Sequence, residues 1–262
     1  MQWNSFAAAK LLTMQLETLR RELQRQPFHP LFATLSGAHL YGFESPDGDL
    51  DLRGAFVLEA HQLIGLKSPQ ETVCRSYLEQ GLEMDLVCHD IAKYCRLVLK
   101  RSGEILEQLY SPLVVWPDPA LEELRELARP YILRDTYYHY RGFLANQLRF
   151  IDRPDSTVKE MLYGYRVALT GIHLMTRGEV LSHLPSLLEL NPQKGVDELL
   201  TLKRTQPEKG PLPEPLRHSH RHRLTELDDE LKQAFENSSL PTQAPPVDRL
   251  HDFVVALRTR PR

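Results

Sequence analysis

Long apolar runs are missing from the sequence. Its 262 residues contain no stretch of about 18 consecutive apolar residues, which is the length that a membrane-spanning helix requires. The first residues also lack the basic segment followed by an apolar one that is typical of a signal peptide. We therefore expect a cytoplasmic protein without a membrane partner.

Cysteines are few, and the net charge is small. The three cysteines, Cys74, Cys88 and Cys95, are odd in number and form no Cys-x-x-Cys pair, so we expect reduced thiols and no disulfide framework. The formal net charge is −3, without the strong basic excess of proteins that coat nucleic acid. Any contact with nucleic acid must therefore come from local patches.

The remaining composition is that of an ordinary folded protein. Apolar residues make up 42% of the chain and charged residues 26%, which is enough apolar material to bury a core. The length exceeds the usual size of a single domain. One large domain and two modest ones are both compatible with this length, and two domains are the working expectation.

The first part of the sequence mixes helical and strand patterns. Apolar residues three or four apart over residues 5–24 predict an amphipathic helix that ends before Pro27. Four strands are predicted, over residues 31–35, 50–58, 71–77 and 82–88. The last two are expected to pair as a hairpin, and the small residues at 36–38 predict a sharp turn from the first strand into a helix.

Beyond residue 90 the pattern becomes helical. Prolines separate the predicted helices, which cover residues 91–100, 104–110, 119–128, 134–151 and 158–176. A loop rich in proline and histidine is predicted near 206–222, before a final helix over 224–235. The expected fold class is therefore α+β, with a small mixed-sheet domain over residues 1–112 and an all-helical domain over 113–262.

Residues 35–54 contain the candidate chemistry. Residues two apart in a strand point to the same face, so Asp49 and Asp51 present two carboxylates together while Leu50 turns into the core. Such a pair is unfavourable unless a divalent cation relieves the repulsion, which favours Mg²⁺ or Mn²⁺ and, through it, a triphosphate. Upstream, Gly37 lies at a strand-to-helix turn where backbone N–H groups can approach phosphate oxygens.

This segment resembles a known signature. A glycine and a small residue after a strand, followed about ten residues later by Asp-x-Asp, is similar to the pattern of DNA polymerase beta superfamily nucleotidyltransferases. The longer string resembles a bacterial and phage branch of predicted nucleotidyltransferases, some of them encoded beside RNA ligases in RNA-repair operons. The matching residues are Gly37, Tyr41-Gly42, Ser45-Pro46-Asp47, Asp49, Asp51 and Arg53-Gly54. Ala38 departs from the usual serine, and Tyr163 stands where a histidine is expected.

The resemblance implies a larger site. It implies a third carboxylate from a later strand, for which Asp85 is the candidate and Glu83 the alternative, and a helix behind the sheet that carries the Leu-Glu-x-Leu of residues 106–109. The predicted catalytic and metal-binding residues are Asp49, Asp51 and Asp85. The predicted nucleotide-binding residues are Gly37, Ala38, Tyr41, Gly42, Ser45, Arg53, Lys159 and Arg166, the last two seven apart on one helical face.

The function implied by the resemblance is the metal-dependent transfer of a nucleoside monophosphate from a nucleoside triphosphate, ATP first, to an acceptor hydroxyl. An RNA end is the leading acceptor, with Mg²⁺ or Mn²⁺ as cofactor and RNA and an RNA ligase as partners. Two alternatives stay open. A protein hydroxyl receives AMP, as in antitoxin members of the superfamily, or the chain is a non-catalytic nucleotide- or RNA-binding module that Ala38 has deprived of turnover.

Several of these features also have structural interpretations. Tyr41 either stacks on a nucleoside or covers the turn as a core aromatic. Alternating histidines at 218, 220 and 222 resemble a zinc site, but no fourth ligand has a recognisable spacing, so a solvated basic loop is preferred. The segment 134–153, rich in arginine and tyrosine, either contacts nucleic acid or exposes its charge and buries its tyrosines.

Overall fold

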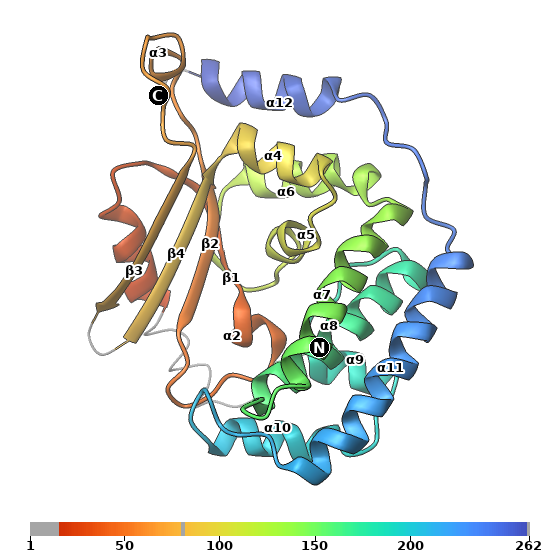
Figure 1. The fold of residues 1–262 in the computed structure, drawn as a ribbon. Coiled ribbons are helices and arrows are strands. Elements are labelled where there is room, and N and C mark those ends of the chain that lie inside the picture. The colour runs from red at the N-terminus through yellow and green to blue at the C-terminus, as the bar shows by residue number, and fades with distance from the viewer. Residues whose placement is uncertain (1–15, 80–81, 261–262) are drawn as a thin grey trace.

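A single mixed sheet forms one side of the molecule (Figure 1). The computed structural model describes residues 16–79 and 82–260. The strands are β1 (Pro30–Leu35), β2 (Leu50–Phe56), β3 (Thr72–Glu79), β4 (Leu82–Asp90) and β5 (Val114–Trp116). Their order across the sheet is β3-β4-β2-β1-β5, and every pair is antiparallel except β2 and β4, which are parallel.

Helices cover the sheet on both faces. Residues 16–24 are helical, and Leu19 and Leu23 pack on the face to which Leu50 and Leu52 point. The opposite face carries an apolar cluster shared by β1 and several helices. The helices of that cluster are α4 (Ile91–Leu99), α5 (Gly103–Leu109), α6 (Pro119–Ala128) and α12 (Asp248–Thr259). Alternation along β2 therefore separates a fully buried face from the face that carries Asp51 and Arg53.

A helical layer lies beside the sheet (Figure 1). This layer is the helical half of the molecule, and its helices are α7 (Tyr137–Ile151), α8 (Val158–Arg177), α9 (Leu184–Leu190), α10 (Val196–Thr205) and α11 (Glu214–Glu236). α8 is central, since it packs against α7, α9, α10 and α11. The short helix α2 (Gly37–Tyr41) contributes Leu40 and Tyr41 to the core of this layer, so the turn after β1 joins the two halves of the molecule.

The expected α+β fold class is confirmed, and each predicted strand and helix of residues 31–176 has a counterpart. The predicted helix over 5–24 lies partly outside the described residues. The short elements α3 (Ala60–Leu63), β5, α9, α10 and α12 were not predicted.

The predicted loop near 206–222 is wrong over its second half. Helix α11 begins at Glu214, so the three histidines at 218, 220 and 222 lie on a helix and only residues 206–213 form a loop. The prediction treated the prolines as loop residues. In the structure Pro213 occupies the position just before the helix and Pro215 lies in its first turn, where proline is well tolerated. The predicted helix over 224–235 is the second half of α11, and α12 follows it.

The sheet side of the molecule extends past residue 112. β5 pairs with β1, and residues of α6 and α12 complete the apolar cluster on one face of the sheet. The division into units at residue 112 stays a prediction, but the helical half is bracketed in sequence by segments that pack with the sheet. Among the helices of residues 16–79 and 82–260, none is long and apolar enough to cross a membrane.

Candidate active site

The turn between β1 and α2 brings the backbone against a carboxylate. Gly37 has a φ of +59°, and a Cβ on it would lie 1.7 Å from Oδ2 of Asp51. The Ser36 N–H donates to the backbone carbonyl of Asp51 at 2.9 Å. Glycine is therefore required here by both its backbone angle and the approach of Asp51, so the turn and the first acidic strand form one unit.

Two of the predicted carboxylates face each other across neighbouring strands. The parallel register pairs Asp51 of β2 with Asp85 of β4, while Asp49 immediately precedes β2 and is half-buried. Arg53 bridges the pair, because its Nη2 lies 2.6 Å from Asp51 Oδ1 and 2.8 Å from Asp85 Oδ2. Glu83, the alternative third carboxylate, is exposed near the start of β4, two residues before Asp85.

The electrostatics of Asp51 reflect crowding of negative charge. Its pKa is raised to about 6, chiefly by burial and also by the negative charges of Asp49 and Asp85, against the opposing effect of Arg53 and Lys159. Three carboxylates therefore influence one another at this point, which is costly without a cation.

The residues present fit a hard divalent cation in their chemistry, since carboxylate oxygens are its preferred ligands. Their arrangement carries a further condition. In the described part of the chain no group of three acidic, histidine or cysteine side chains is gathered around a common point, and the guanidinium of Arg53 lies between Asp51 and Asp85. A cation bound by all three carboxylates therefore uses the oxygens that Arg53 leaves open, Asp51 Oδ2 and Asp85 Oδ1, or displaces Arg53 from one of the pair.

A cavity of about 200 Å³ adjoins this pair. It lies between the sheet and the helical half, with walls from the β1–α2 turn, β2, α5, α7 and α8. The residues that line it are Ser36, Gly37, Tyr41, Asp51, Arg53, Glu104, Glu107, His139, Phe143, Tyr163, Arg166 and Val167. The carboxylate face of β2 thus opens into a space that the helical half closes.

Arg166 is held at the back of this cavity by a buried ion pair. Its Nη1 lies 2.7 Å from Glu107 Oε1, and the two side chains are 4% and 2% exposed. The Tyr41 hydroxyl donates to the other Glu107 oxygen at 2.9 Å, and the Arg166 guanidinium stacks on the Tyr41 ring at 4.0 Å. Tyr41 is thus buried beside this ion pair and also lines the cavity. Glu107, in the predicted Leu-Glu-x-Leu helix, is a partner that the site-residue predictions omitted.

Tyr163 occupies the space between the two basic residues of α8. Its ring lies 5.7 Å from Lys159 Nζ and 5.6 Å from the guanidinium of Arg166, and its edge packs on Tyr41 and Phe43. Burial raises the pKa of Tyr163 to about 12. The predicted face of Lys159 and Arg166 exists, with a neutral tyrosine between the two charges.

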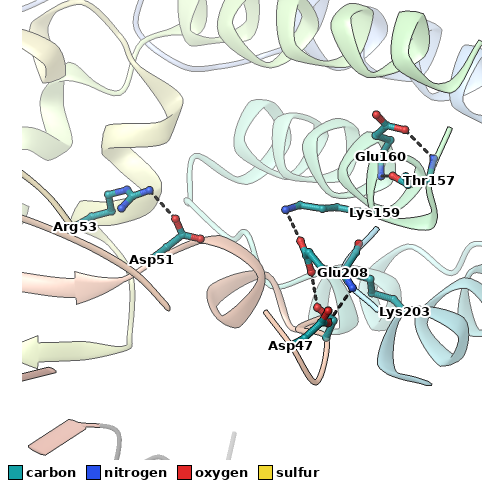
Figure 2. A network of polar contacts seen from close by, with 9 residues as sticks. Asp47, Asp51, Arg53, Thr157, Lys159, Glu160, Lys203 and Glu208 are labelled. Atoms are coloured by element: carbon teal, nitrogen blue, oxygen red, sulfur yellow. Dashed lines mark hydrogen bonds and ion pairs between the residues drawn. The ribbon is translucent and has the colours of Figure 1, made fainter. Parts of the chain in front are cut away.

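Lys159 meets a different residue, Glu208, in the loop between α10 and α11 (Figure 2), and Ser45 contacts the same residue. The Glu208 carboxylate forms ion pairs with Lys159 and Lys203 and accepts a hydrogen bond from the Ser45 hydroxyl. Burial favours its neutral form, but the hydrogen bonds from these three groups prevail and lower its pKa to about 2. Lys203 and Glu208 were not predicted, although a lysine in the apolar stripe of a helix signals a buried partner.

The other predicted nucleotide-binding positions are backbone features. Gly42 ends α2 with a φ of +79°, and a Cβ there would lie 2.4 Å from His183 Nε2. The side chain of Ala38 is buried in the core of the helical half, and its carbonyl accepts from the N–H groups of Gly42 and Phe43. These residues shape the loop that leads to Ser45.

The histidines of α11 do not converge on a metal. His220 is buried and shares a 2.7 Å hydrogen bond with the Tyr165 hydroxyl, whereas His218 and His222 are both exposed on the helix surface. No metal-binding group that includes them occurs within residues 16–79 and 82–260. His220 is therefore a core residue of the helical half.

Comparisons with known proteins place the chain in a family. The model of RlaP, the RNA repair pathway DNA polymerase beta family, matches residues 12–256. The uncharacterized protein MJ0002 of Methanocaldococcus jannaschii is 27% identical over 217 residues, covering 80% of this chain and 86% of that protein. A crystal structure of a nucleotidyltransferase-like protein from Exiguobacterium sibiricum has a TM-score of 0.31 and 12% identity, covering 94% of this chain and 79% of that one, a likeness too slight to carry an argument. Because the family match extends over most of the sequence, the chain belongs to the RNA repair pathway DNA polymerase beta family.

Proposed function

We propose that the protein transfers a nucleoside monophosphate from a nucleoside triphosphate, ATP first, to the hydroxyl of an RNA end. One observation carries the proposal: Asp51 and Asp85 lie side by side on parallel strands, Asp49 adds its negative charge next to Asp51, and Asp51 lines a cavity between the sheet and the helical half. Membership of an RNA-repair family supports RNA as the acceptor.

Asp49, Asp51 and Asp85 are the residues that would hold Mg²⁺ or Mn²⁺. A bound divalent cation supplies neutralisation of phosphate charge and activation of a hydroxyl nucleophile. Arg53 neutralises part of the same carboxylate charge in the protein alone. Once it releases a carboxylate, its planar guanidinium is suited to pair with a phosphate oxygen.

The carboxylates differ in exposure, which suggests a division of roles. The side chain of Asp85 is 35% exposed and that of Asp51 17%. An acceptor hydroxyl therefore has better access to Asp85, while Asp51 lies deeper, against the Gly37 turn. We assign Asp85 to the acceptor side of the reaction and Asp51 to the nucleotide side.

The test is a transfer assay with purified protein, Mg²⁺ or Mn²⁺, each α-labelled nucleoside triphosphate in turn, and RNA with a 3′-hydroxyl. Label in RNA that is lost in Asp49→Ala/Asp51→Ala supports the proposal. The matched control is Asp252→Ala, which removes an exposed carboxylate on α12 and is expected to retain activity. Comparison of Asp85→Asn with Glu83→Gln tests the third carboxylate, because only the first is expected to abolish transfer.

Two results contradict the proposal. Label on a protein band, with none in RNA, assigns the chain to AMP transfer onto protein. Nucleotide binding without label in either acceptor assigns it a binding role without turnover, in which the bridge made by Arg53 persists. Neither result is compatible with an RNA end as the acceptor.

A further inference from the structure

The carboxylate of Glu208 occupies a site built from three donors that come from three separate segments. Figure 2 shows two of these donors, Lys159 and Lys203, beside Glu208. Ser45 lies in the loop after α2, Lys159 in the first turn of α8, and Lys203 near the end of α10. All three contact the Glu208 side chain, and Lys203 also donates to its backbone carbonyl at 3.1 Å. Side chains from distant parts of the sequence thus surround a single anionic group.

The charges in this site are unequal. Two ammonium groups and one hydroxyl face a single carboxylate, and Lys203 is only 1% exposed. A buried lysine is unfavourable unless an anion accompanies it. One carboxylate neutralises half of this positive charge, whereas a phosphate chain carries several negative charges and several acceptor oxygens. The donors are therefore better matched by phosphate than by Glu208.

The site is electrostatically connected to the acidic strands. The positive charge of Lys159 lowers the pKa of Asp51, and the negative charge of Asp49 raises the pKa of Lys159, although burial of that lysine acts in the opposite direction. Lys159 therefore pairs with Glu208 while its charge also acts on the carboxylates that would hold the cation. A nucleotide whose phosphate chain extends from one to the other would satisfy both.

The backbone around Glu208 is fixed, while its side chain borders solvent. The Glu208 N–H donates to Asp47 Oδ1 at 2.8 Å. Beyond it, Val158 donates to the carbonyl of Gly210 at 3.1 Å, and Leu212 donates to that of Ser156 at 2.9 Å. The residues on either side, 207 and 209, are exposed. Rotation of the side chain therefore removes the carboxylate from the donors without unfolding the loop.

We propose that Ser45, Lys159 and Lys203 form a binding site for the phosphate chain of the nucleotide, and that Glu208 occupies this site in the nucleotide-free protein and leaves it on binding. The identity of the ligand rests on the proposed function. The assignment adds Lys203 as a phosphate-binding residue and Glu208 as an internal competitor that excludes stray anions. An internal competitor weakens the apparent affinity for phosphate, because only the fraction of molecules in which Glu208 has left the site can bind it.

The first experiment measures binding of inorganic tripolyphosphate by calorimetry, in EDTA, to wild-type protein and to Glu208→Gln. The variant is expected to bind about tenfold more tightly or better, since one charged hydrogen-bond partner no longer competes. Glu44→Gln is the matched control, because it removes one exposed negative charge next to Ser45. Equal affinity in wild type and Glu208→Gln, or an equal gain in Glu44→Gln, overturns the proposal.

A second measurement guards against loss of folding in Glu208→Gln, which leaves the buried charge of Lys203 without a carboxylate. The variant is expected to have a lower thermal midpoint than wild type and a larger rise of that midpoint with tripolyphosphate. Replacement of both partners, Lys203→Met/Glu208→Gln, is expected to abolish the extra rise. A rise in Glu208→Gln no larger than in wild type contradicts the site.

These experiments do not depend on turnover, so the two proposals fail separately. Tighter tripolyphosphate binding by Glu208→Gln without transfer of label to RNA leaves the anion site standing and refutes the transferase proposal. Transfer of label by the wild type with no gain in binding by Glu208→Gln leaves the transferase proposal standing and refutes the role of Glu208.

Discussion

Replacement of Arg166 by methionine tests whether this arginine serves the fold or the nucleotide. Its guanidinium is paired with Glu107 in surroundings where both side chains are almost fully buried. Loss of one partner leaves the other as an uncompensated buried charge, which costs about 3–5 kcal/mol. Methionine retains much of the side-chain volume, so the loss reports the ion pair more than a cavity. The expected decrease is a large part of the 5–15 kcal/mol by which domains are typically stable.

Urea unfolding followed by circular dichroism measures the free energy of unfolding of wild type, Arg166→Met, Glu107→Gln and the double variant. Each single variant is expected to be strongly destabilised. The double variant is expected to lose less free energy of unfolding than the two single variants lose together. Arg96→Met is the control, since Arg96 pairs at the surface with Glu71 and its loss is expected to cost about 0–1 kcal/mol. A loss below about 1 kcal/mol for Arg166→Met, together with weaker nucleotide binding, would refute this reasoning.

Three further predictions concern the turn, the loop and the sheet. Gly37→Ala forces a Cβ onto the Asp51 carboxylate and is expected to lose about 1–3 kcal/mol of stability and most transfer activity, whereas Gly142→Ala, which has open space around it, gains about 0.5–1 kcal/mol. The pKa of Glu208 is lowered from 4.5 to about 2. Its contribution to the free energy of unfolding is therefore complete above pH 4.5 and is lost as the pH falls toward 2. The stability difference between wild type and Glu208→Gln, about 1–2 kcal/mol after solvent screening, should vanish over that range in pH-dependent unfolding. Asp90→Ala removes a buried acceptor of two backbone N–H groups and an arginine of α12 and is expected to cost about 2–4 kcal/mol, measured by thermal unfolding.

Local patterns were sufficient to predict the acidic strand and its orientation. The alternation of Leu50 and Leu52 with Asp51 and Arg53 has a period of two, and the structure buries the first pair and turns the second to the other face. The hairpin of β3 and β4 follows from the same kind of signal. This alternation does not indicate which strand pairs with β2. The parallel register that places Asp51 opposite Asp85 depends on the whole sheet.

Contacts between distant segments explain the remaining omissions. Ser45 and Glu208 are 163 residues apart in sequence, and no periodicity connects them. Glu107 occurred in a predicted helix, but its pairing with Arg166 follows from the packing of α8 against the turn after β1. Prolines near 213 were interpreted as loop residues because the pattern alone does not distinguish the first turn of a helix from the loop before it.

The position of α12 has a consequence for how the chain folds during synthesis. Its residues Leu250, Phe253 and Leu257 complete the apolar cluster of α4 and α6 on the sheet, and its Arg258 pairs with the buried Asp90 at 2.6 Å. Domains usually fold in order as they leave the ribosome. Here the strands emerge first, yet their covering layer is finished by a segment made more than 100 residues later. The side of α4 and α6 that α12 covers, together with the buried carboxylate of Asp90, therefore stays uncovered until the helical half has been synthesised, and release of a truncated chain would expose that apolar patch to aggregation.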